Sequence, residues 1–201
     1  MISVLQNTII PFCIEYRSII VIIHLLSAAV GVGGATITDL LFFRFLKDFK
    51  ITKEEADTMN SISALIWIAL FVLIISGIAL YLPETGRLND SAKFFTKMTA
   101  IIVLIVNGII LNILIAPKLP FISFEDQKIP IENKHHILRR FAFALGAISI
   151  SSWYFIFILG ALRKFTLNFH QFILIYVSLL IIAIIGSQIF NHFMSKKARN
   201  I

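Results

Sequence analysis

The sequence has 201 residues, of which 58% are hydrophobic and only 14% are charged. Soluble proteins carry about 25% charged residues, so this composition excludes an ordinary soluble enzyme and a disordered chain, and the single cysteine excludes an internal disulfide. The net charge of +7 does not indicate a nucleic-acid partner, because the basic residues are scattered among acids without an aromatic binding platform. We interpret the positive charge as basic residues that set the membrane topology and are attracted to anionic headgroups.

Five apolar stretches are long enough to cross a bilayer. A hydrocarbon core about 30 Å thick needs roughly 20 apolar residues in a helix, and backbone groups in lipid must bond internally, which favours helices. The stretches cover residues 18–43, 62–82, 94–116, 138–162 and 169–193. We therefore predict an all-α integral membrane protein, a five-transmembrane-helix bundle in which residues 1–201 form a single membrane domain. We expect it in a bacterial inner (plasma) membrane.

Basic residues predict the orientation of this bundle. Most of the 18 Lys and Arg residues lie between spans one and two, between spans three and four, and in the C-terminal tail. Because loops rich in Lys and Arg stay on the cytoplasmic side, the N terminus is predicted to be outside and the C terminus cytoplasmic. In the first of these links, Thr52 and Glu55 fit a capping box, which predicts a helix start there.

Ionisable residues inside a span are costly and are therefore functional candidates. His24 lies about six residues into the first span, and Gly31 and Gly34 follow it on the same helix face. Small residues permit close approach by another helix or by a flat ligand. Two interpretations of His24 stay open: a ligand to a metal or haem iron in a groove, or a histidine hydrogen-bonded to a neighbouring helix.

Asp39 lies 15 residues beyond His24, near the predicted cytoplasmic surface. The helical rise separates the two residues by about 22 Å, so they do not share a site. We interpret Asp39 as an interfacial acid that is paired with Arg44 or Arg140. A role in a proton relay is the alternative.

Three polar residues mark the third span. Lys97 lies at its outer end, where a lysine either meets an anionic group such as a propionate or extends to the headgroups. Asn107 and Asn112 lie deeper in the same span. Asparagines in spans commonly bond across to another helix, so we interpret both as structural links.

Two histidines lie at similar depth near the outer leaflet, His24 in the first span and His170 at the start of the fifth. Bis-histidine haem needs two imidazoles at one depth on different helices, so this pair is a candidate metal site if spans one and five are neighbours. Lys97, Gly31 and Gly34 complete the candidate cofactor-binding set. The sequence has no CxxC, CxxCH or HxxxH spacing, so it supports neither a zinc motif nor covalent haem.

Three segments carry a resemblance to a known family. They are Ile23-His24-Leu25-Leu26, the span from Lys97-Met98 through Asn107 and Asn112 to Ala116-Pro117-Lys118-Leu119, and Leu138-Arg139-Arg140. In these segments the chain resembles the copper-resistance D family and related small integral membrane proteins, and more distantly the membrane protoporphyrinogen oxidases. The resemblance implies copper handling or porphyrin chemistry, with His24 as the haem ligand.

Three functions follow from these observations as hypotheses. The first is a protein that binds b-type haem through span histidines and acts in membrane redox or porphyrin chemistry, with a quinone or porphyrin as its partner. The second is a transporter or a copper-handling permease. The third is a non-catalytic assembly or structural subunit. The sequence leaves open whether the protein is an enzyme, and it is compatible with a homo-oligomer.

Overall fold

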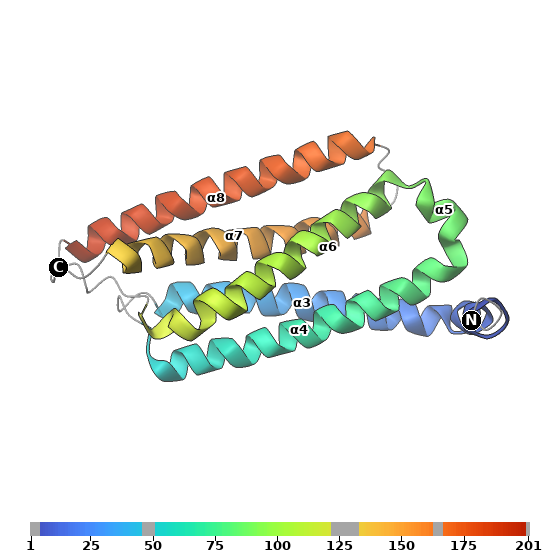
Figure 1. Ribbon diagram of the computed structural model, residues 1–201, viewed down its shortest axis with the longest axis horizontal. Coiled ribbons are helices and arrows are strands. Elements are labelled where there is room, and N and C mark those ends of the chain that lie inside the picture. The colour runs from blue at the N-terminus through green and yellow to red at the C-terminus, as the bar shows by residue number, and fades with distance from the viewer. Residues whose placement is uncertain (1–4, 46–50, 122–132, 163–166, 200–201) are drawn as a thin grey trace.

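The computed structural model describes residues 5–45, 51–121, 133–162 and 167–199. Parts of the basic links, residues 46–50 and 122–132, therefore lie outside the described residues. Five of the described helices are long and apolar enough to cross a membrane. They are α3 (Arg17–Phe45), α4 (Lys53–Tyr81), α6 (Ala92–Ile110, extended by η4 and η5), α7 (Asn133–Ala161) and α8 (Phe169–Arg199) (Figure 1). The predicted all-helical architecture with five long apolar helices is confirmed.

Large apolar side chains cover the outside of these helices. On α8, for example, Leu174 and Ile182 are each 70% exposed. Monomeric soluble proteins rarely expose an apolar surface of this extent to water, whereas lipid tails solvate such a surface. The protein is therefore an integral membrane protein whose helices present their apolar faces to a bilayer.

The helices extend beyond the predicted apolar spans because capped polar turns continue them. Helix α4 begins at Lys53, nine residues before the predicted span. Thr52 caps it: the Thr52 side chain accepts a hydrogen bond from the Glu55 backbone N–H (3.3 Å), and the Glu55 carboxylate accepts one from the Thr52 N–H (2.9 Å). The predicted capping box is confirmed.

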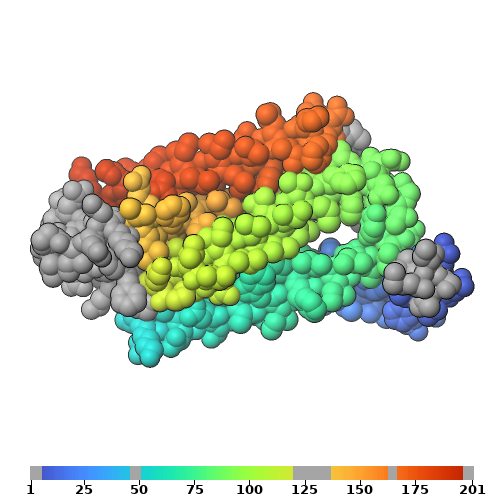
Figure 2. All heavy atoms as spheres, viewed as in Figure 1, coloured from blue at the N-terminus to red at the C-terminus, as the bar shows by residue number. Residues whose placement is uncertain are grey.

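The bundle consists of two groups of helices. Helices α3 and α4 pack along each other as an antiparallel hairpin, and α7 packs against α6 and α8. The two groups meet where α3 packs on α7, so α7 lies between α3 and α8 (Figure 1). Toward α5 (Thr85–Asn89), α4 and α6 diverge and the surface between them is hollowed (Figure 2). We call this end the α5 end and the opposite one the α3–α4 end.

Hydrogen bonds join α7 to its neighbours at three depths. Asn107 on α6 donates from Nδ2 to the Leu145 carbonyl oxygen (3.0 Å). The Tyr176 hydroxyl on α8 lies 2.8 Å from Ser152 Oγ, and the Ser152 hydrogen is directed to a carbonyl in its own helix, so Tyr176 donates. Thr36 Oγ1 on α3 lies 3.1 Å from the Tyr154 hydroxyl. These bonds satisfy polar groups that lipid cannot hydrate.

The α5 end carries a short N-terminal segment, η1 (Leu5–Ile9) and α2 (Ile10–Glu15), which runs across the bundle axis (Figure 1). Two ion pairs lie at this end: Glu84, in η3 (Leu82–Glu84), binds Arg17 at 2.9 Å and Arg87 at 2.7 Å. The start of α3 is thereby tied to the α4–α6 connection.

Candidate functional site

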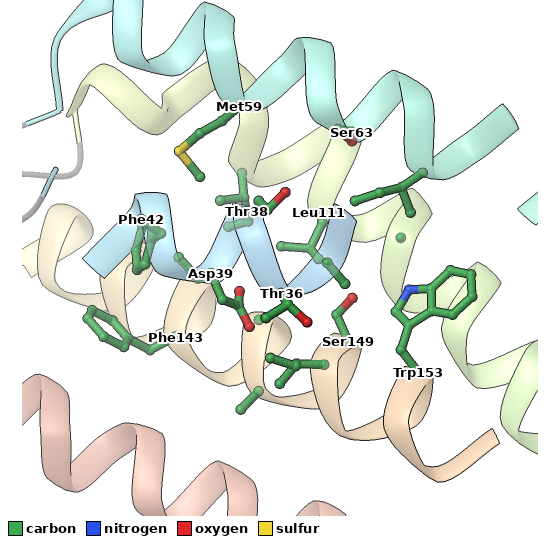
Figure 3. Close-up of a pocket in the computed structure, with 18 of the residues that line it drawn as sticks. Thr36, Thr38, Asp39, Phe42, Met59, Ser63, Leu111, Phe143, Ser149 and Trp153 are labelled. Atoms are coloured by element: carbon green, nitrogen blue, oxygen red, sulfur yellow. The ribbon is translucent and has the colours of Figure 1, made fainter. Parts of the chain in front are cut away.

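A cavity of about 720 Å³ lies between the helices, toward the α3–α4 end. All five long helices contribute to its walls, which are mostly aliphatic and aromatic. Figure 3 shows side chains from α3, α4, α6 and α7 converging on this space. A concave, largely apolar space with a few polar groups is typical of a small-molecule site.

Asp39 on α3 is the one ionisable side chain among the described residues that line the cavity. Its side chain lies between α3 and α7, near Thr36 and Ser149 (Figure 3). A Cβ built on Gly146 of α7 would lie 3.4 Å from Asp39 Oδ1, so the missing side chain of this glycine makes room for the carboxylate.

The expected partners of Asp39 are not in contact with it. Arg140 instead bonds to Gln188, and neither of the two ion pairs found in the described part of the chain includes Asp39 or Arg44. The predicted ion pair of Asp39 with Arg44 or Arg140 is therefore not formed among the described residues. Sequence position alone placed this residue near the membrane surface, whereas the close α3–α7 packing turns it into the cavity.

The cavity opens sideways onto the lipid-facing surface. Leu40 and Phe43 belong to its lining, and yet they are 63% and 42% exposed. Across the opening, α8 contributes the small residues Gly186 and Ser187. The side of the cavity between α3 and α8 is therefore the one that faces lipid.

The part of the cavity wall that follows α6 contains a change of helix type. Helix α6 continues after Ile110 as the π-helical segment η4 (Leu111–Ile115) and the 3₁₀ segment η5 (Ala116–Phe121). Leu111, Asn112 and Ile115 of η4 line the cavity. Asn112 is thus exposed to this space, whereas Asn107 is buried and bonds to α7. Short π-helical turns occur frequently at functional sites.

His24 lies outside the cavity, with its ring against α4. Its Nδ1 is 2.9 Å from Ser76 Oγ, whose own hydrogen is directed to the Val72 carbonyl oxygen at 2.7 Å. Ser76 therefore accepts, and His24 carries its proton on Nδ1. The lone pair on Nε2 is left for another partner. Lys97 lies close enough to His24 for their charges to interact.

The glycine face that follows His24 is filled by other helices. A Cβ on Gly31 would lie 2.3 Å from the Trp153 ring of α7, and a Cβ on Gly34 would lie 2.7 Å from Ile66 of α4. The sequence predicted that this glycine face approaches either another helix or a flat ligand. In the structure it approaches other helices, and the Trp153 ring occupies the space beside Gly31.

The structure does not bring His24 and His170 together. Helix α7 packs against both α3 and α8 and lies between them. Helices α3 and α8 contact each other at the α3–α4 end, where the rings of Phe43 and Phe190 meet. His170 is exposed at the other end of α8, and its ring neighbours Phe169. Among the residues that the structure describes, no three His, Cys, Asp or Glu side chains gather as metal ligands.

Sequence reasoning missed most of the cavity lining. Both tryptophans of the chain, Trp67 and Trp153, belong to it, although a tryptophan in a span is typical of core packing or of the membrane interface. Gly146 of α7 faces Asp39, and nothing in the sequence of α7 indicates this contact. The signal available in the sequence was the Asp39 carboxylate inside an apolar span. An ionisable group is costly to place in a membrane, so Asp39 was a functional candidate for that reason alone.

In comparisons with protein-family models, curated proteins and solved structures, no match to this chain was found. The function is therefore argued from the geometry of the molecule.

Proposed function

We propose that this small multi-span membrane protein is a carrier that binds a lipid-soluble cation in the central cavity. The observation that carries the proposal is the Asp39 carboxylate, which faces an apolar cavity without an ion-pair partner among the described residues. This proposal belongs to the transporter class predicted as an alternative from the sequence.

The chemistry of the lining supports a cationic ligand. A carboxylate in apolar surroundings is stabilised when an opposite charge comes close, and that attraction is strong because little water screens it. Trp67 and Trp153 add aromatic faces, which attract cations. The remaining apolar wall suits the hydrophobic body of the same ligand.

The position of the cavity supports transfer rather than storage. Its lateral opening at Leu40 and Phe43 gives access from lipid. We also propose that the α3–α4 end is cytoplasmic, as the distribution of Lys and Arg indicates. Asp39 then lies in the cytoplasmic half of the membrane, and protons compete with the cation for its carboxylate.

Intrinsic fluorescence tests this proposal, because the only two tryptophans of the chain line the cavity. We expect tetraphenylphosphonium to change the fluorescence of the purified protein in uncharged detergent. The variant Asp39→Asn is expected to bind it about tenfold more weakly, which corresponds to about 1.4 kcal/mol. The amide keeps the size of the side chain and removes only its charge.

Two controls separate charge recognition from hydrophobic partitioning. Asp57→Asn makes the same substitution on the exposed first turns of α4 and is expected to bind as the wild type does. Tetraphenylborate has the same shape as the probe and the opposite charge, so we expect it not to bind. Equal binding of both ions, or unchanged binding in Asp39→Asn, would overturn the proposal.

Haem binding by His24, in membrane redox or porphyrin chemistry, is a second candidate function. Two observations favour it: the hydrogen bond to Ser76 orients the ring with its Nε2 lone pair unused, and the charge of Lys97 acts on the ring and would attract a propionate. Imidazoles that bind metals usually donate their other ring N–H to a protein oxygen.

A visible spectrum of protein produced with added haem tests this second candidate. We expect a Soret band that sharpens on dithionite reduction, with resolved α and β bands, and we expect His24→Ala to remove it. His170→Ala is the matched control and is expected to keep the spectrum, since His170 is exposed and apart from His24. A colourless wild-type protein would eliminate this function.

A further inference from the structure

We propose that a second pocket, between α7 and α8 at the α3–α4 end, binds a phosphate group. This pocket has a volume of about 310 Å³. Its lining is polar throughout and consists of Arg139, Arg140, Gln188, Asn191, His192 and Ser195. It shares no lining residue with the Asp39 cavity, so this proposal does not depend on the proposed function.

Two side chains of α8 bond to the Arg139 guanidinium. Arg139 is only 4% exposed. Its Nε donates to Asn191 Oδ1 at 3.0 Å, and its Nη2 donates to Ser195 Oγ at 2.8 Å. Ser195 in turn donates to the Asn191 carbonyl oxygen at 2.8 Å, so the acceptor groups are themselves fixed on α8. The positive charge therefore has a set position in the pocket wall.

Arg140 supplies a second guanidinium. Gln188 holds it at two points: Arg140 Nε donates to Gln188 Oε1 at 3.4 Å, and Gln188 Nε2 donates to the Arg140 carbonyl oxygen at 3.0 Å. The side chain is exposed, and within the described part of the chain its terminal Nη groups have no hydrogen-bond partner. Their fork of N–H donors matches the oxygens of a phosphate.

The composition of the lining selects an anion. It contains two guanidinium groups, an imidazole and neutral polar groups, and none of the described side chains that line the pocket is a carboxylate. The terminal N–H donors of Arg140 are left for an anion, and a charge this near to lipid is costly unless an opposite charge compensates it. A tetrahedral phosphate accepts from several directions at once and so suits donors that come from two helices.

The depth of the pocket favours a lipid headgroup as the source of the phosphate. Arg139 and Arg140 lie in the first turn of the apolar part of α7, which begins at Ile137. This is the depth at which headgroups meet the hydrocarbon region, and basic pockets between helices at that depth bind anionic headgroups. Free phosphate has the same chemistry, so the test distinguishes the two.

Native mass spectrometry of the full-length protein in uncharged detergent measures this binding. The probes are short-chain phosphatidylglycerol, phosphatidylcholine and inorganic phosphate. We expect phosphatidylglycerol to bind and Arg140→Gln to weaken it about tenfold, because the charge-assisted contact of Arg140 is lost. Gln188→Ala, which releases Arg140 without removing a charge, is expected to weaken it less. Arg44→Gln makes the same charge change at the same end outside the pocket and is expected to leave binding unchanged.

The outcomes separate the two sources from a failure of the proposal. Binding of phosphatidylglycerol that inorganic phosphate does not displace supports a lipid headgroup, and displacement by inorganic phosphate supports a free anion. If Arg140→Gln binds phosphatidylglycerol as tightly as the wild type, or if Arg44→Gln loses as much affinity, the attraction is a general effect of positive charge and the site is rejected. Both variants change exposed residues, so the fold is expected to persist.

Discussion

Replacing Gly31 with leucine is expected to lower the unfolding temperature of the purified protein by about 10 °C, from about 3 kcal/mol of overpacking. The cause is the approach of two helices. A Cβ at Gly31 would lie 2.3 and 2.4 Å from two carbons of the Trp153 ring, which is buried at 2% exposure. Either α3 and α7 separate or the ring moves into the adjoining cavity, and both changes disturb the packing. Circular dichroism in detergent measures the shift.

Gly33→Leu is the matched control for this prediction. Gly33 lies two residues away on the same helix, and a Cβ there has no neighbouring atom within 4 Å. The substitution therefore adds the same side chain to the same helix without a clash. If both leucine variants unfold at the same temperature, the contact between Gly31 and Trp153 does not limit stability. A double variant that combines Gly31→Leu with Trp153→Ala is expected to recover part of the loss.

The spans could be predicted from the sequence because each depends on residues within one helix. The five apolar runs and the Thr52–Glu55 capping box are local patterns, and the structure has the corresponding helices and cap. The helix ends were less predictable, since polar turns such as Lys53–Ser61 continue a helix beyond its apolar part. Hydropathy locates the part of a helix that suits lipid, and capping decides where the helix ends.

The candidate site could not be predicted to the same degree because it depends on which helices meet. The pattern around Gly31 and Gly34 predicted a surface for close approach, but it did not identify Trp153 and Ile66 as the residues that approach. Asp39 illustrates the same point. Its distance from the end of the span suggested an arginine partner, whereas the α3–α7 contact at Gly146 directs it into the cavity.

Replacing Gly146 with leucine is expected to reduce tetraphenylphosphonium binding by about a hundredfold, which corresponds to about 2.7 kcal/mol. A Cβ at this position would lie 3.4 Å from Asp39 Oδ1, an ordinary contact distance, so the backbone does not have to move. The rest of the leucine side chain then occupies the space in front of the carboxylate. The effect exceeds that of Asp39→Asn because the leucine both covers the charge and displaces the ligand.

A double-mutant cycle shows whether the loss is due to the carboxylate. If Gly146→Leu acts by covering Asp39, the double variant with Asp39→Asn is expected to bind no more weakly than Gly146→Leu alone, since the charge is already inaccessible. Gly33→Leu is again the control and is expected to bind as the wild type does, because Gly33 is not part of the cavity. Fully additive losses would mean that the leucine weakens binding without covering the Asp39 carboxylate. Tryptophan fluorescence and unfolding temperature, measured on the same samples, distinguish a blocked cavity from a damaged fold.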